Sequence, residues 1–226
     1  MPGGEQITRW PLPPSNKIQN FSLWQLGSSL VIPAVGILSK LMAGILDWRH
    51  VLNSRIMRWT AAAHDICFTN DWHAQFFALG KTIPVIRGAG VYQRGMDFCL
   101  DRLNAGAWVH FFPEGKVNMA KNEFIRLKWG IGRLIAECKI CPIVIPFWHL
   151  GMDSVLPNVE PYRPKIGQKV TIYIGNPIDF TIIRDKFSSE YKSAVKRRKV
   201  ITDKIQEQLF QLKPVTERLH VERYQS

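Results

Sequence analysis

Cysteine, acidic residues and nucleotide-binding signatures are all scarce or missing in this sequence. Four cysteines among 226 residues are too few for a disulfide-stapled scaffold, so free thiols or a reducing compartment is expected. Only 18 Asp and Glu accompany 30 Lys and Arg, and the formal net charge of +12 indicates an anionic partner, with phosphate the obvious group. The charge is not accompanied by a helix-turn-helix, zinc-finger, RNA-binding or glycine-rich nucleotide motif. We therefore expect no nucleic-acid partner and no cofactor.

Internal repeats and low-complexity tracts are also missing. With 46% hydrophobic and 21% charged residues, the composition excludes both a disordered chain and a multi-span membrane protein. A chain of this length suits one α/β domain, or a domain with a small appendage.

The N-terminal part of the chain differs in composition from the rest. Residues 1–20 are polar and rich in Pro and Gly, which predicts an unstructured lead. Residues 21–43 then form a predicted anchor, because the sequence carries no charged side chain between Lys17 and Lys40. The apolar stretch approaches the length of a membrane span, but Pro33 and several polar residues within it favour a shallow, membrane-interfacial helix. A true span is the second interpretation and a buried core helix the third; residues 44–226 form the remaining domain.

The rest of the chain alternates between the periodicities of strands and helices. Short apolar runs predict strands at residues 83–86, 107–112, 142–148 and 169–174. Helical spacing of apolar residues predicts helices at 91–104, 128–139 and 191–212. The alternation predicts an α/β fold with a mixed, partly parallel sheet covered by helices.

Two strand ends carry residues suited to binding, because ligands of α/β sheets usually lie outside the carboxyl ends of strands. Arg87 leaves a buried strand and meets Gly88, so its guanidinium could bind phosphate oxygens, or else cap a carbonyl or pair with a carboxylate. Glu114 follows the strand-ending Pro113 and precedes Gly115. That carboxylate could orient a substrate hydroxyl, hold a basic residue such as Arg87, or be a solvated turn residue.

Two further clusters have a plainer interpretation. Cys138 and Cys141 have metal-like spacing, but a structural zinc site needs four ligands and the other two cysteines are distant, so two buried thiols and no metal site are expected. The basic run 196–199 on the long C-terminal helix indicates a solvated face or a contact with anionic headgroups.

Taken in order, these blocks resemble the phospholipid acyltransferase family of glycerol-phosphate and lysophosphatidate type. The shared pattern consists of the glycine-to-arginine block ending at Arg87, the Phe-Pro-Glu-Gly block at 112–115 and the proline-bounded strand at 142–146. Within the family, the longest runs resemble the transacylases that remodel cardiolipin; these runs are 58–60, 65–69, 95–98, 112–118, 128–138 and 148–152.

The resemblance implies a glycerol-phosphate acyltransferase-like fold and a mitochondrial phospholipid–lysophospholipid transacylase that needs no acyl-CoA. It implies cardiolipin, monolysocardiolipin and other phospholipids and lysophospholipids as partners, and peripheral or monotopic attachment to an anionic membrane surface facing the intermembrane space. The substrate-binding residues that it implies are Arg87, Gly88, Glu114, Gly115 and Lys116. Nothing in the sequence determines the oligomeric state.

The family's catalytic signature, a His followed five positions later by an Asp, is missing from this chain. None of the six histidines has an acidic residue at that distance, so no catalytic residue is assigned. In the family the signature precedes the segment that matches Gly44, and here the apolar anchor comes directly before Gly44. We infer that an internal stretch with one strand and the catalytic turn is missing, and hypothesise that this polypeptide is catalytically silent or nearly so. The alternative to an enzyme is a non-catalytic, membrane-bound phospholipid-binding isoform.

Overall fold

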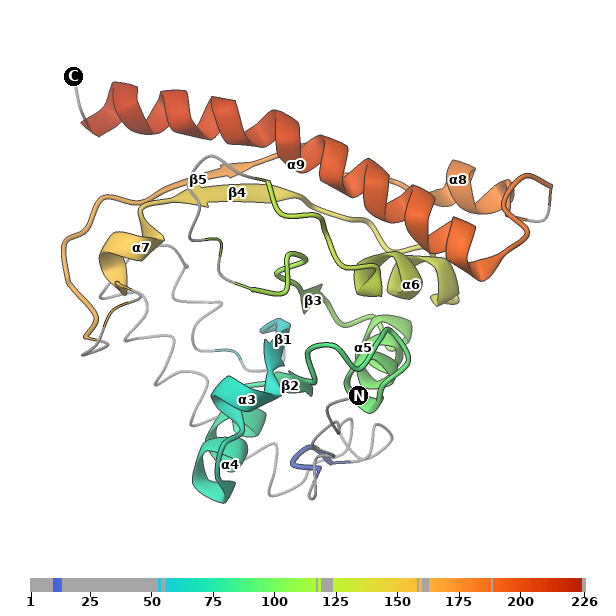
Figure 1. The fold of residues 1–226 in the computed structure, drawn as a ribbon, viewed down its shortest axis with the longest axis horizontal. Helices are drawn as coiled ribbons and strands as arrows, with labels where there is room; N and C mark the ends of the chain where they lie inside the picture. Colours follow the sequence, from blue (N-terminus) through green and yellow to red (C-terminus); the bar gives the residue numbers. More distant parts are fainter. Residues whose placement is uncertain are drawn as a thin grey trace.

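A computed structural model describes residues 10–13, 53, 56–116, 118, 124–157, 159, 163–187 and 189–224. In chain order (Figure 1), the elements are β1 Trp59–Ala63, α3 His64–Cys67, α4 Asp71–Leu79, β2 Thr82–Val85, α5 Arg94–Asn104, β3 Val109–His110, α6 Gly130–Glu137, β4 Phe147–Leu150, α7 Met152–Val155, β5 Thr171–Ile174, α8 Thr181–Asp185 and α9 Ala194–Tyr224. The predicted α/β fold, with a partly parallel sheet flanked by helices, is confirmed.

The first sheet is parallel and has the strand order β2-β1-β3. The central strand β1 pairs with β2 over the whole length of β2, from Thr60 opposite Thr82 to Ala63 opposite Val85. Its pairing with β3 involves only Trp59 opposite Val109 and Thr60 opposite His110. Since all three strands run the same way, their carboxyl ends meet at one edge of the sheet.

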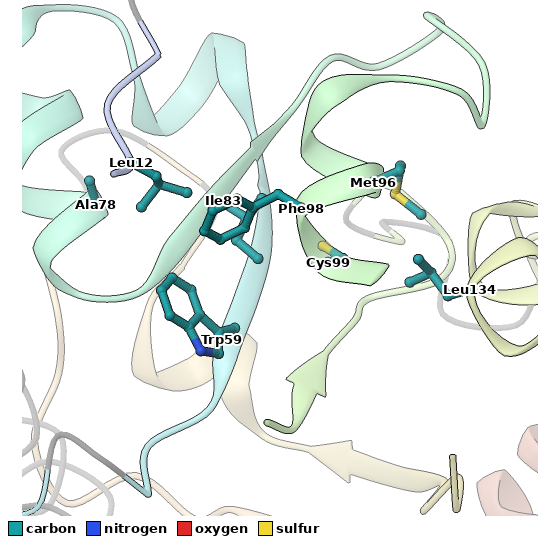
Figure 2. Packing of buried hydrophobic residues seen from close by; sticks show 8 residues of the cluster. All are labelled: Leu12, Trp59, Ala78, Ile83, Met96, Phe98, Cys99 and Leu134. Atoms are coloured by element: carbon teal, nitrogen blue, oxygen red, sulfur yellow. The ribbon is translucent and has the colours of Figure 1, made fainter. Parts of the chain in front are cut away.

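One face of this sheet packs against helices α4 and α5 and forms the first hydrophobic core. Trp59, Ile83, Phe98 and Cys99 lie at its centre, and each is at most 5% exposed. Figure 2 shows these side chains converging between β1, β2 and α5. Gly95 lets α5 come this close to β2, because a Cβ there would collide with the carbonyl oxygen of Pro84.

Leu12 completes the same core from the N-terminal segment. Residues 10–13 form no helix or strand, yet Leu12 is only 4% exposed and lies beside Ala78 and Ile83 (Figure 2). Trp10 packs edge-on against Phe98, with ring centroids 5.8 Å apart, and the Arg94 guanidinium lies 4.4 Å from its indole. We refer to residues 10–13 as the N-terminal strap. Sequence reasoning placed these residues in an unstructured lead and did not predict their contact with the core.

The second sheet is the antiparallel pair β4–β5, covered by the long helix α9 (Figure 1). Its register runs from Phe147 opposite Ile174 to Leu150 opposite Thr171. Helix α9 also packs on α6, where Gly132 allows the approach because a Cβ would collide with the Arg198 carbonyl. The second hydrophobic core lies between α6, α8 and α9.

The predicted strand at 142–148 is largely wrong. Only Phe147 and Trp148 of that range belong to β4, and the preceding residues contribute a single isolated bridge between Val144 and Ile178. Pro142 and Pro146 lack the amide hydrogens that a ladder needs, which limits pairing here. The predicted strand at 107–112 shortens to two residues, Val109–His110.

Helix α9 extends well beyond the predicted end at residue 212. Leu212 and Thr216 remain buried against the second sheet, and Thr171 Oγ1 lies 2.9 Å from the Nδ1 atom of His220. The Lys169 ammonium donates a 3.0 Å bond to the Tyr224 carbonyl at the helix end. These tertiary contacts stabilise α9 on both sides of Pro214, a residue that would otherwise interrupt a helix.

The predicted anchor at 21–43 lies outside the described residues, as does most of the predicted lead at 1–20. Within the described part of the chain, the structure contains no helix that is long and apolar enough to cross a membrane.

Candidate functional site

The carboxyl edge of the parallel sheet gathers the predicted binding residues and one that sequence reasoning missed. Arg87 follows β2, Asp65 follows β1 and Glu114 follows β3. Since β1 lies between the other two strands, it separates Arg87 from Glu114 and places Asp65 next to Arg87. This edge is where open α/β sheets usually bind ligands.

Arg87 forms an ion pair with Asp65 across neighbouring strands. Both side chains are about half exposed. The hydrogen bond from Arg87 holds the pKa of the Asp65 carboxyl below its usual range. Of the alternatives open for Arg87, the structure therefore has the one in which it pairs with a carboxylate, and a phosphate at this position would compete with Asp65.

Glu114 does not hold Arg87 in the part of the chain that the structure describes. One of its carboxylate oxygens, Oε2, is buried and has no hydrogen-bond partner there. Burial raises the pKa of Glu114. The interpretation of Glu114 as the partner of Arg87 is thus wrong, whereas its role toward a substrate hydroxyl stays a prediction.

The turn that carries Glu114 has a fixed backbone. Gly115 has φ of +70°, a value that favours glycine, and its amide donates to the Phe112 carbonyl at 3.1 Å. The Lys128 amide donates to the Pro113 carbonyl at 2.8 Å and ties the turn to the segment before α6. Lys116 is exposed beside it.

The Arg87 loop is held by the side chain of Gln93. The Ile86 amide donates to Gln93 Oε1 at 2.8 Å, and Gln93 Nε2 donates to the carbonyls of Ile86 at 3.1 Å and Gly90 at 2.8 Å. Gly88 and Gly90, with φ of +87° and +82°, let the chain turn within this clamp. The Gln93 side chain therefore fixes the backbone on both sides of Arg87-Gly88.

A buried charge network supports the far end of that loop. Arg133 of α6 is 5% exposed; it donates to the Val91 carbonyl at 2.8 Å and to Asp97 at 2.6 Å. Its guanidinium also lies 4.4 Å from the Tyr92 ring, and Arg198 of α9 lies 4.6 Å from the same ring and donates to its hydroxyl. Three helices thus meet at the loop that positions Arg87.

The four cysteines are free, and Cys138 and Cys141 are buried and half-buried respectively. Burial raises the pKa of the Cys138 thiol. Among the described residues, no group of three or more His, Cys, Asp or Glu side chains could hold a metal ion.

Comparison with known proteins places this geometry in a family. The family model described as Acyltransferase matches residues 42–149, a range that contains the whole parallel sheet and both candidate turns. Tafazzin of Drosophila melanogaster is 49% identical over 180 residues, which are 80% of this chain and 47% of that protein. This chain carries a tafazzin-type acyltransferase domain.

Two further relatives cover parts of the same acyltransferase domain. Taffazin of Dictyostelium discoideum is 36% identical over 67% of this chain and 54% of its own length. N-acylphosphatidylethanolamine synthase of Arabidopsis thaliana is 40% identical over 58% of this chain and 48% of its own length. The chain spans about half the length of these curated relatives.

Two site residues escaped the sequence prediction. Asp65 follows the strand Trp59–Ala63, whose three alanines give no strong strand signal, so its place at the sheet edge was not foreseen. Gln93 acts through its amide on backbone groups, and only the folded loop reveals such contacts.

Proposed function

We propose that this chain is a phospholipid-binding protein of the tafazzin type. The reaction proposed for this type of protein is acyl transfer between a phospholipid and a lysophospholipid without acyl-CoA. Cardiolipin and monolysocardiolipin are the proposed substrate pair, and the proposed location is a mitochondrial membrane facing the intermembrane space. The observation that carries the proposal is the 49% identity to a tafazzin over 80% of this chain. The similarity to the Arabidopsis N-acylphosphatidylethanolamine synthase also supports a phospholipid substrate.

The proposed roles of the site residues follow from the sheet edge. Arg87, Gly88 and Lys116 would bind the phosphate, and Glu114 with Gly115 would contact the glycerol hydroxyl. A carboxyl with a raised pKa and a buried oxygen without a partner in the described residues is suited to such a hydroxyl. The net charge of +12 supports binding at an anionic lipid surface.

Binding without turnover is the second candidate function. It is favoured by the missing His–Asp signature, since acyl transfer to a lipid hydroxyl needs a general base. The division of the strands into two sheets is consistent with a missing internal strand.

Acyl transfer and vesicle binding separate the two candidates. The purified full chain is mixed with cardiolipin vesicles and a radiolabelled lysophospholipid, and labelled phospholipid is measured beside sedimentation of the protein with the vesicles. Transfer above the rate without protein supports a transacylase and overturns the hypothesis of a silent chain. Sedimentation without transfer supports the binding isoform. If the protein shows neither transfer nor sedimentation, the proposed function is rejected.

A further inference from the structure

The two faces of the parallel sheet differ in what covers them. Side chains of one face, from Trp59, Ala61, Ile83 and Val109, belong to the first hydrophobic core. Because successive side chains of a strand point to opposite faces, Thr60 and His110 project from the other face. Both are only half-buried. We call this the open face of the sheet.

His110 lies on the open face within a chain of ring contacts that reaches the second sheet. Its imidazole lies 4.6 Å from the Phe112 ring and 5.4 Å from the Phe147 ring. Phe147 in turn lies 6.4 Å from the His149 ring. His110 is therefore held in place by packing.

Arg58 approaches His110 from the neighbouring strand. Thr60 is the register partner of His110, and Arg58 precedes Thr60 by two residues, which puts it on the same side of the chain. Burial, together with the positive charge of Arg58 and the nearby His149, lowers the pKa of His110 to about 4. The Arg58 charge therefore acts directly on His110.

Arg58 and His110 each contain a buried nitrogen atom that could bind a ligand. The Nε atom of Arg58 and the Nε2 atom of His110 are both buried and lack a hydrogen-bond partner across the described residues. No acidic side chain in that part of the chain pairs with Arg58, whereas Arg87 pairs with Asp65. A buried polar group left without a partner destabilises the fold, because it has lost its hydrogen bonds to water. An oxyanion bound between Arg58 and His110 would supply the missing acceptors.

We propose that Arg58 and His110 bind a phosphate group of a phospholipid on the open face of the sheet, at a position separate from the phosphate proposed beside Arg87. The guanidinium supplies charge and planar N–H donors, and the imidazole donates from Nε2. The inference deepens the proposed function, on which it rests for the choice of a lipid as the source of the phosphate.

Apolar side chains beside His110 fit the rest of such a ligand. Trp108 and Phe112 lie two residues before and two residues after His110 and are 54% and 56% exposed. The Trp108 Nε1 atom donates to the Ile56 carbonyl at 2.7 Å, which fixes the indole next to the segment that carries Arg58. A cationic group between exposed aromatic side chains matches a phosphate that carries acyl chains.

Nuclear magnetic resonance of the His110 ring protons in the full chain tests the proposal. Inorganic phosphate and a soluble short-chain phosphatidylglycerol are titrated separately, and the pKa of His110 is measured with each. We expect an anion to raise this pKa from about 4, because it stabilises the protonated imidazole. The other ionisable groups nearby are Arg58 and His149, with Asp153 beside His149. A pKa of His110 that neither of the two probes changes overturns the proposal.

Matched variants supply the second readout. Arg58→Gln should weaken binding of the short-chain phospholipid at least tenfold, Arg58→Lys should weaken it less, and Arg218→Gln should leave it unchanged. Arg218 is the control because it carries the same charge on an exposed stretch of α9. Equal losses in Arg58→Gln and Arg218→Gln overturn the inference.

The two probes separate the possible sources of the phosphate. A shift of the His110 pKa with phosphatidylglycerol but not with inorganic phosphate supports a lipid source, and the reverse supports a free phosphate ion and rejects the lipid. Vesicle binding that survives Arg58→Gln rejects this inference and leaves the proposed function standing.

Discussion

Truncating Leu12 to Ala tests whether the N-terminal strap is part of the folded domain. The Leu12 side chain is 4% exposed and fills the core between Ala78 and Ile83 (Figure 2). Leu-to-Ala changes in well-packed cores cost about 3–5 kcal/mol of unfolding free energy. The strap belongs to no helix or strand, so it can detach and relieve part of the cavity. We therefore expect a cost of about 2 kcal/mol, below that range.

Thermal unfolding of the full chain measures this cost. For a chain of 150–250 residues, each kcal/mol lowers the midpoint by about 2–4 °C, so Leu12→Ala should lower it by about 4–8 °C. Leu219→Ala is the matched control, because Leu219 is 36% exposed on α9 and its truncation should cost less than about 0.5 kcal/mol.

The result that refutes this reasoning is a midpoint for Leu12→Ala equal to that of Leu219→Ala. It would mean that the strap does not dock in solution and that the core is complete without it. Trp10→Ala should move the midpoint in the same direction as Leu12→Ala, because it removes the contacts with Phe98 and Arg94.

Two other predictions concern the Arg87 loop and the buried histidine. Gln93→Ala removes three hydrogen bonds to the loop and should accelerate hydrogen exchange of the Ile86 amide at least tenfold; an unchanged rate would show that the clamp is dispensable. His110 titrates near pH 4 when folded and near its ordinary value of 6.5 when unfolded, so the unfolded chain binds more protons between these values and the unfolding free energy should fall by about 3 kcal/mol as the pH drops from 6.5 to 4. His110→Asn should flatten that part of the stability curve, and an identical slope in both proteins would contradict the assignment.

The predictable elements are those whose pattern is local. Apolar spacing at Met96, Cys99 and Leu103 is sufficient for α5, and the apolar run before Arg87 is sufficient for β2. Strand β1 was missed because Trp59–Ala63 is mostly alanine, which has little strand propensity, and it is stabilised by pairing with strands from both sides. Its position as the central strand is a tertiary property.

The site was only partly predictable for the same reason. The turns at Arg87 and Glu114 follow from glycine and proline next to apolar runs. Which acid pairs with Arg87 depends on strand order, and the position of β1 between β2 and β3 gives that partner to Asp65. The Arg58–His110 pair depends on register across β1 and β3, which no single segment encodes.

Loss of an internal strand would affect acyl transfer and phosphate binding differently. If an internal strand with the catalytic turn is missing, the chain loses its general base and its sheet loses continuity. The two-residue pairing of β3 with β1 and the separate β4–β5 sheet are consistent with such a loss. Arg58 directly precedes β1 and His110 lies on β3, the two strands that remain paired, and their donors need only an anion. Phosphate binding therefore depends on described parts of the fold, whereas turnover would depend on the internal stretch that we infer to be missing. We expect the two activities to separate in this chain: Arg58→Gln should weaken lipid binding at least tenfold, whereas acyl transfer should already be absent from the unaltered protein.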